Sequence, residues 1–215
     1  MSDLTQRLFL ILPPAPDLLT ALDPVFGDPA LACAWIRAQK QSDMADIDVA
    51  DIKGLTSSVS ALQRHEIAVL FDDPEHVAKT HADGVCVTAG PNGGLDALQR
   101  AIKSIKPQGI VGAGGLNSRH DAMMAGELDI DFVMFGEPCP NAKALPPAEV
   151  ADRASWWAEI FTIPCVAWAG EVGAIAPLAA TGCEFIALTL EEDAGPAGNR
   201  KVIENALSIL KAAQP

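Results

Sequence analysis

Charged side chains that directly follow apolar runs are the residues of this sequence best suited to bind a ligand. Arg37 follows the run from Leu31 to Ile36. Asp72 and Asp73 follow the run that ends at Phe71. Carboxylates provide oxygen ligands for a hard cation, and a guanidinium pairs bidentately with an anionic group. A salt bridge between neighbouring strand ends would use the same three side chains without any ligand, so both interpretations stay open.

Glycines form a second group of candidate binding positions. The apolar run at Ile110 stops in a glycine cluster, and other apolar runs end at single glycines; the positions are Gly112, Gly114, Gly115, Gly136 and Gly170. Where a strand ends and a helix begins, backbone N–H groups point outward and can bind an anion. These glycines can equally serve only the packing of a barrel, with no ligand.

The stretch from Gly109 to Pro138 contains the elements that must position these residues. It alternates an apolar run, a glycine loop, a short helix and a second apolar run within about 30 residues, which is typical of a βαβ unit. Asn117 and Ser118 offer N-caps to the helix, and Gly126 ends it. Both glycine-rich strand ends of this unit are therefore expected at one edge of a parallel sheet.

A pattern within this stretch recurs elsewhere in the chain. A helix end, an acidic residue and a buried-type strand follow one another in the segments Thr80–Thr88, Gly126–Gly136 and Thr181–Thr189, whose acidic residues are Asp83, Asp131 and Glu184. The copies lie about 50 residues apart, which leaves room for two βα units per period. Even spacing of paired units favours a closed barrel over an open sheet.

Eight strands are predicted, at Leu8–Leu12, Leu31–Ile36, Ile67–Phe71, Gly84–Val87, Ile110–Val111, Phe132–Phe135, Pro164–Trp168 and Phe185–Leu188. Their mostly continuous apolar character is typical of parallel sheets. Helical stretches separate them, and a loop from Glu191 to Asn199 is expected before a C-terminal helix. The sequence therefore predicts an α/β fold, a (β/α)₈ TIM barrel in which residues 1–215 form a single domain. A doubly wound open sheet is the alternative.

Bulk properties exclude several kinds of partner. The chain has 215 residues and a formal net charge of −13, which argues against nucleic acid or an anionic membrane surface. No apolar run approaches the roughly 18 residues that span a bilayer. Five scattered cysteines without a C-x-x-C pair indicate a reducing compartment, so a cytoplasmic protein is expected. Trp156 and Trp157 are adjacent on a predicted helix, so one ring is expected to pack against the barrel and the other to lie at an interface, for which a homodimer is a candidate.

The order and spacing of several segments resemble motifs of the thiamine phosphate synthase superfamily, which includes tautomerase-like relatives. W-I-R-A-Q, ending at Gln39, resembles a Q-x-R-x-K motif, and F-D-D resembles an N-D-D motif. D-I-D-F-V-M-F-G-E-P-C-P-N-A-K, from Asp129 to Lys143, resembles a strand end of the family in which Gly136 and Lys143 carry over. I-P-C-V-A-W-A-G-E resembles a glycine-pair motif, of which Gly170 matches one member.

Several polar positions of the family motifs carry other residues here. Trp35 and Gln39 stand where the family has glutamine and lysine, and Pro91 stands where it has a metal-binding aspartate. Gly114 takes the place of a serine, and Leu116 takes the place of a histidine. A leucine cannot accept a proton, so the tautomerase reaction of the family is not expected.

The resemblance implies a reaction that joins a hydroxymethylpyrimidine diphosphate to a thiazole phosphate with release of diphosphate. On this basis Arg37 and Lys143 are predicted to be catalytic, Asp72 and Asp73 to bind Mg²⁺, and four glycines to contact the small phosphorylated heterocyclic substrate; these are Gly112, Gly114, Gly136 and Gly170. The alternative is a catalytically degenerate barrel homologue that binds a small ligand or a protein.

Overall fold

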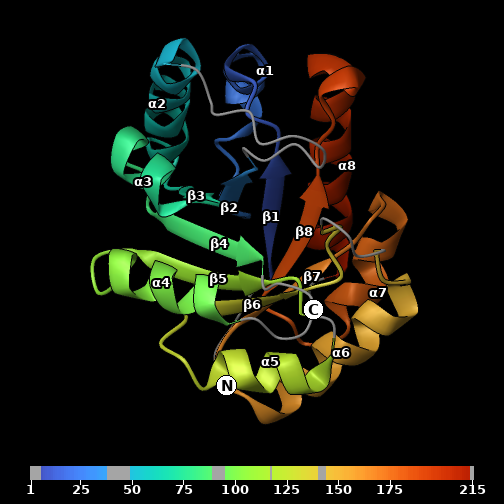
Figure 1. Ribbon diagram of the computed structural model, residues 1–215. Coiled ribbons are helices and arrows are strands. Elements are labelled where there is room, and N and C mark those ends of the chain that lie inside the picture. Colours follow the sequence, from blue (N-terminus) through green and yellow to red (C-terminus); the bar gives the residue numbers. More distant parts are fainter. Residues whose placement is uncertain (1–5, 38–48, 89–94, 117, 140–143, 214–215) are drawn as a thin grey trace.

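A computed structural model describes residues 6–37, 49–88, 95–116, 118–139 and 144–213 of the chain. Within these ranges, eight parallel strands close into a barrel in chain order (Figure 1). They are β1 (Arg7–Leu12), β2 (Leu31–Ile36), β3 (Ala68–Phe71), β4 (Gly84–Thr88), β5 (Ile110–Gly114), β6 (Phe132–Phe135), β7 (Cys165–Trp168) and β8 (Phe185–Thr189). Pairing of β1 with β8 closes the ring. The predicted (β/α)₈ barrel is confirmed, and the open sheet is wrong.

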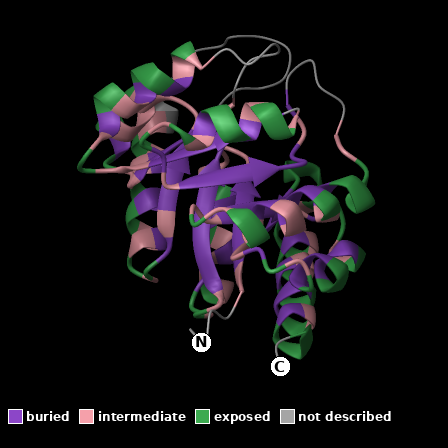
Figure 2. Cartoon of the chain, turned by 90° about the horizontal axis from the view of Figure 1, so that it is seen from below, coloured by how far each residue is buried: buried purple, intermediate pink, exposed green. Residues whose placement is uncertain are grey.

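Helices surround the barrel (Figure 1). They are α1 (Pro16–Leu22), α2 (Val49–Gln63), α3 (Pro74–Thr80), α4 (Asp96–Ile105), α5 (Arg119–Gly126), α6 (Pro147–Ile160), α7 (Ile175–Ala179) and α8 (Gly195–Ala213), with short 3₁₀ turns η1 (Asp23–Val25), η2 (Val172–Ala174) and η3 (Glu192–Ala194). Buried residues concentrate on the strands, whereas exposed residues lie on the helices (Figure 2). Among the described residues, no helix has the length and apolar character needed to cross a membrane.

Alternation along the strands divides the buried side chains between two clusters. In β2, Cys33 and Trp35 belong to the cluster that fills the barrel lumen, whereas Ala34 and Ile36 belong to the layer between strands and helices. Such alternation follows from the two-residue period of a β-strand. The lumen is packed with side chains: the rings of Phe9 and Phe132, from β1 and β6, meet edge to face at 5.7 Å between centroids.

The recurring acidic residues lie at the amino ends of the strands and bind backbone amides of neighbouring strands. Asp83 accepts a hydrogen bond from the N–H of Val69 at 2.7 Å. Asp131 accepts one from the N–H of Val111 at 2.7 Å, and Glu184 accepts one from the N–H of Cys165 at 2.8 Å. We call these three contacts the amide clamps. They explain the repeat as a device that ties β4 to β3, β6 to β5 and β8 to β7.

The region between β8 and the C-terminal helix differs from the prediction. The predicted loop Glu191–Asn199 is wrong in its second half, because α8 begins at Gly195. The buried Asn199 side chain donates hydrogen bonds to the carbonyl oxygens of Glu191, at 2.7 Å, and Gly195, at 3.0 Å. Its amide therefore satisfies carbonyls around the first helical turn, which offsets the low helix propensity of this glycine-containing stretch.

Candidate active site at the barrel mouth

All eight strands are parallel, so their carboxyl ends lie together at one end of the barrel, which we call the barrel mouth. Arg37 follows β2, Asp72 follows β3, and Gly170 comes soon after β7. The structure thus brings these predicted site residues to the same end of the molecule. Lys143 lies outside the described residues, as do Gln39 and Pro91.

Arg37 is fixed at the barrel mouth by two contacts. Its Nη1 donates a hydrogen bond to the carbonyl oxygen of Pro138 at 2.8 Å, which ties the end of β2 to the loop after β6. Its guanidinium carbon lies 4.7 Å from the ring centroid of Trp35, two residues earlier in β2. Cation–π and hydrogen-bonding contacts of this kind hold the guanidinium in one orientation, which favours the bidentate binding of an anion.

Glu137 is a buried carboxyl group at the barrel mouth that the sequence reasoning missed. Only 5 % of its surface is exposed. Its Oε1 accepts a hydrogen bond from the N–H of Gly115 and lies 3.6 Å from the Sγ of Cys139. Burial raises the pKa of Glu137 to about 7, although the Gly115 N–H and the positive charge of Arg37 both favour the ionised form. The signal in the sequence was a glutamate directly after the glycine that ends a buried strand.

Gly114 and Gly112 leave room for other side chains in the lumen. A Cβ atom on Gly114 would overlap the Oε1 of Glu137 and would lie 3.8 Å from the Sγ of Cys86. A Cβ atom on Gly112 would overlap the ring of Phe132. Packing alone therefore accounts for glycine at both positions, and their contact with a substrate stays a prediction.

Gly136 and Gly170 turn the chain at the ends of β6 and β7. Their φ angles are +95° and +66°, in the left-handed region that favours glycine. A Cβ atom on Gly136 would also overlap Val150 of α6. The turn at Gly136 places Glu137 in the lumen, since the carboxyl group reaches the space beside Gly114. This turn is what brings an acid into the barrel mouth.

The two predicted metal ligands have different surroundings. Asp73 is the N-cap of α3, and its Oδ1 accepts a hydrogen bond from the N–H of Glu75 at 2.7 Å. Asp72 and Asp73 line a cavity of about 540 Å³ together with Thr88 of β4 and Arg100 of α4. In the described part of the chain, no group of three or more His, Cys, Asp or Glu side chains has the geometry to hold a metal ion. Binding of Mg²⁺ by Asp72 and Asp73 therefore stays a prediction, in which water and a substrate diphosphate would have to supply most of the ligands.

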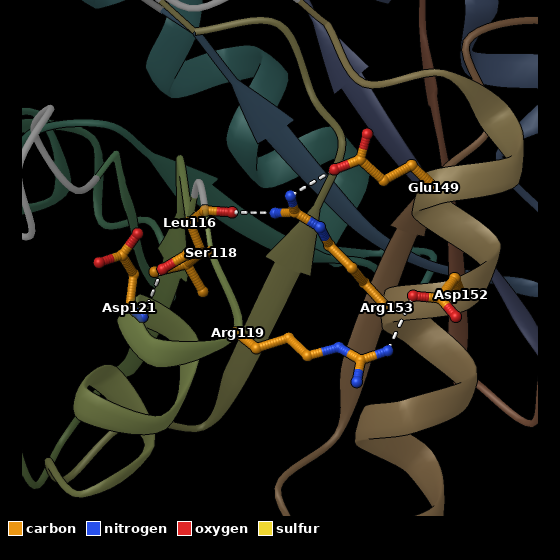
Figure 3. Close-up of polar contacts among 7 residues, drawn as sticks. All are labelled: Leu116, Ser118, Arg119, Asp121, Glu149, Asp152 and Arg153. Atoms are coloured by element: carbon orange, nitrogen blue, oxygen red, sulfur yellow. Dashed lines mark hydrogen bonds and ion pairs between the residues drawn. The ribbon is translucent and has the colours of Figure 1, made fainter.

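Helix α6 anchors the loop after β5 (Figure 3). Arg153, which is almost fully buried, donates from Nη1 to the carbonyl oxygen of Leu116 at 3.0 Å. Its Nη2 donates to the Oε1 of Glu149 at 2.6 Å, which orients the guanidinium. Leu116, which the sequence resemblance aligns with a histidine of the family motif, is thus buried, and its backbone is held in place.

A second pair of contacts completes this junction (Figure 3). The side chain of Ser118 accepts a hydrogen bond from the N–H of Asp121 at 3.1 Å and caps α5, as its position in the sequence predicts. Arg119 pairs with Asp152 of α6 at 2.8 Å. These contacts fix the start of α5 relative to α6, so the loop between β5 and α5 is held from both sides.

Comparisons with known proteins agree on one relationship. The sequence profile of the family described as thiamine monophosphate synthase matches residues 37–191. A thiamine-phosphate synthase of Rhodospirillum centenum is 34 % identical over 204 residues, which cover 89 % of this chain and 92 % of that protein. A thiamine-phosphate synthase of Hyphomonas neptunium is 31 % identical over 193 residues, which cover 85 % of this chain and 84 % of that protein.

A solved structure has the same fold. The thiamine phosphate pyrophosphorylase of Pyrococcus furiosus superposes with a TM-score of 0.73 at 17 % identity, and the match covers 99 % of each chain. The fold and the polar barrel mouth define a (β/α)₈ barrel protein with its candidate site at the carboxyl ends of the strands. The chain belongs to the thiamine monophosphate synthase family.

Proposed function

We propose that this chain acts as a thiamine phosphate synthase, joining a hydroxymethylpyrimidine diphosphate to a thiazole phosphate with release of diphosphate. The observation that carries the proposal is Arg37, held at the barrel mouth by the Pro138 carbonyl and the Trp35 ring in a chain related to synthases over nearly its whole length. A homodimer and a cytoplasmic location stay predictions from the sequence.

In this reaction the chain must stabilise a departing diphosphate. Arg37 would bind the diphosphate through two N–H groups, and its fixed orientation removes part of the entropy loss of binding. When bound by Asp72 and the substrate, Mg²⁺ would supply positive charge for the leaving group. The buried Trp35 Nε1–H has no hydrogen-bond partner among the described residues, which leaves a donor for a polar ligand group.

A specific observation favours the second candidate, a catalytically degenerate homologue that binds a small ligand or a protein. Where family motifs place polar side chains, this chain has Trp35, Gly114 and Leu116, all buried or without a side chain. If these positions correspond to those of the family motifs, the site would retain Arg37 for anion binding but would lack several groups that orient the heterocycles. We therefore expect synthase turnover to be slow.

The direct test is formation of thiamine phosphate by the purified chain with both substrates and Mg²⁺, measured by chromatography. We expect slow product formation that Asp72→Asn abolishes or makes independent of Mg²⁺. We expect Arg37→Met to lower kcat/KM by ~10²-fold or more, the usual effect of losing a charged group that stabilises developing charge. Asp129→Asn is the matched control, because Asp129 is an exposed carboxylate just before β6, at the amino ends of the strands.

The outcome of this assay separates the two candidates. Normal turnover by Asp72→Asn would show that the metal assignment is wrong. Absence of product, together with a rise in melting temperature on addition of thiazole phosphate or diphosphate with Mg²⁺, would favour the binding protein over the enzyme.

A further inference from the structure

We propose that Glu137 is a positioning residue that couples anion binding at Arg37 to the uptake of one proton, so that a phosphorylated ligand binds when Glu137 is neutral. The inference rests on the proposed function only for the choice of diphosphate as the ligand. It concerns a residue that no motif of the family resemblance assigns to the site.

The geometry places the acid and the cation together. Arg37 donates to the carbonyl oxygen of Pro138, the residue directly after Glu137. The carboxyl group of Glu137 turns inward to the N–H of Gly115, in the space that the absent side chain of Gly114 leaves. An anion that binds the guanidinium of Arg37 therefore approaches the end of the lumen that holds this carboxyl group.

The other groups around Glu137 do not compete for this role. Cys86 of β4 and Cys139, in the same segment as Glu137, face the carboxyl group, and burial raises the pKa of both thiols, that of Cys139 to about 12. Both therefore stay neutral at physiological pH. The loop after β5 contributes the Gly115 N–H. Among the described groups that act on Glu137, Arg37 is the charged one.

The coupling follows from linkage between the two binding events. An ionised Glu137 offsets the positive charge of Arg37 and repels a bound anion, so the anion binds more weakly to this form. By reciprocity, a bound anion makes ionisation of Glu137 less favourable and raises its pKa. The pKa of Glu137 is already near 7, so the free protein loses the proton over the physiological range. With full coupling, anion affinity would fall about tenfold between pH 6 and pH 8.

Isothermal titration calorimetry of the wild-type chain with sulfate and with diphosphate tests the inference. Sulfate does not change its own protonation in this range, so proton uptake with sulfate belongs to the protein. In two buffers of different ionisation enthalpy at pH 8, we expect net uptake of roughly 0.5–0.9 proton per sulfate bound. No net uptake between pH 7 and pH 8, or no binding of either anion at any pH, would overturn the proposal.

Variants give the second readout. Glu137→Gln keeps an acceptor for the Gly115 N–H but cannot ionise. We expect it to bind sulfate about as tightly as the wild type at pH 6 and about tenfold more tightly at pH 8, with no proton uptake. Arg37→Met should abolish binding. Glu171→Gln is the matched control, since Glu171 is an exposed carboxylate in the loop after β7 and should keep the wild-type pH slope.

Two results distinguish this inference from the proposed function. Proton-coupled anion binding without thiamine phosphate formation would leave the inference intact and count against the synthase. If the sulfate affinity of Glu137→Gln depends on pH as strongly as that of the wild type, the inference is wrong, whether or not the synthase reaction occurs. If the variant fails to fold, the wild-type proton count alone decides.

Discussion

At the scale of single residues, the barrel mouth depends on two neighbouring positions of the lumen, one without a side chain and one whose side chain occupies the space left free. Gly114 provides no side chain, and the carboxyl group of Glu137 fills the space beside it. The sequence resemblance aligns Gly114 of β5 with a serine of the family motif, whereas the polar group in this part of the lumen is the Glu137 carboxyl group, which comes from the segment after β6. The two residues therefore form one structural unit, and neither can be changed without affecting the other.

This pairing predicts non-additive effects of mutation. Gly114→Ala should lower the free energy of unfolding by roughly 1–3 kcal/mol, because the new methyl group overlaps the Glu137 carboxyl group in a packed lumen. In the double variant with Glu137→Ala the colliding group is gone, so we expect at least ~1 kcal/mol of the loss to be recovered as coupling energy. Urea unfolding of the wild type, both single variants and the double variant measures this.

Two results would contradict the pairing. Additive losses in the double-mutant cycle would mean that the two residues do not share the space. Gly198→Ala is the control for adding a methyl group as such: Gly198 lies in α8, where a Cβ atom would be 3.4 Å from the nearest side chain, and the change should be neutral or stabilising.

The position of a site residue could be predicted from the sequence where the residue directly follows a strand. Arg37 and Asp72 follow continuous apolar runs, so their place at the carboxyl end of a strand follows once the strand is recognised. Glu137 was not found because its inward direction depends on the left-handed turn at Gly136, which alternation alone does not give. A packing role for Gly112 and Gly114 was one of the two interpretations of the sequence, but the side chains that they accommodate could not be predicted, since these come from β6 and from the segment after it.

At the scale of elements, the strands were predicted to within a few residues and the N-cap of α5 was identified. These features are local: apolar runs define strands, and a serine before the helix defines its first turn. The start of α8 at Gly195 was not predicted from the sequence. It depends on the side chain of Asn199, which donates hydrogen bonds to the carbonyl oxygens of Glu191 and Gly195. The recurring acids were visible as a pattern, but their hydrogen bonds connect neighbouring strands and need the barrel.

The amide clamps predict a loss of stability without a loss of ligand binding. Asp131→Ala removes the acceptor of the Val111 N–H and the partner of Lys106 at 2.6 Å. A buried N–H without a partner costs about 1–3 kcal/mol, so we expect a loss of this size in the free energy of unfolding. Diphosphate affinity should be unchanged, because the clamp lies at the opposite end of the barrel from Arg37.

Urea unfolding and calorimetry on the same preparations measure both quantities. Asp152→Ala is the control for the loss of an ion pair between two elements. Its pair with Arg119 is exposed and is expected to contribute no more than ~1 kcal/mol to the free energy of unfolding. An equal loss of stability in Asp131→Ala and Asp152→Ala would show that Asp131 contributes only as one partner of a surface ion pair. A large change in diphosphate affinity in Asp131→Ala would show that the two ends of the barrel are not independent.

At the scale of the whole molecule, the buried carboxyl group makes stability depend on pH. The pKa of Glu137 is raised from 4.5 to about 7 in the folded chain, so the folded state holds the proton more tightly than the unfolded state. Stability therefore falls as the pH rises from about 4.5 to about 7, and Glu137 adds no further change above that range. The full effect is up to ~3 kcal/mol.

Unfolding measured at pH 5 and at pH 8 tests this prediction. The wild type should lose stability between these values, and Glu137→Gln should lose markedly less, because a glutamine cannot ionise. At pH 8 the variant should therefore be the more stable of the two. The same pH slope in both chains would mean that Glu137 is not the group responsible.

The amide clamps also have a consequence for the topology of the chain. Each clamp joins residues only 14 to 20 positions apart in the sequence, within one consecutive pair of strands. The pairing of β1 with β8, by contrast, brings Arg7 to Phe185 and closes a loop of almost the entire chain. By loop-closure entropy, that contact costs roughly 2 kcal/mol more than a clamp. The three carboxylates thus join neighbouring strands that are close in the sequence, whereas closing the barrel requires the one long-range pairing of β1 with β8.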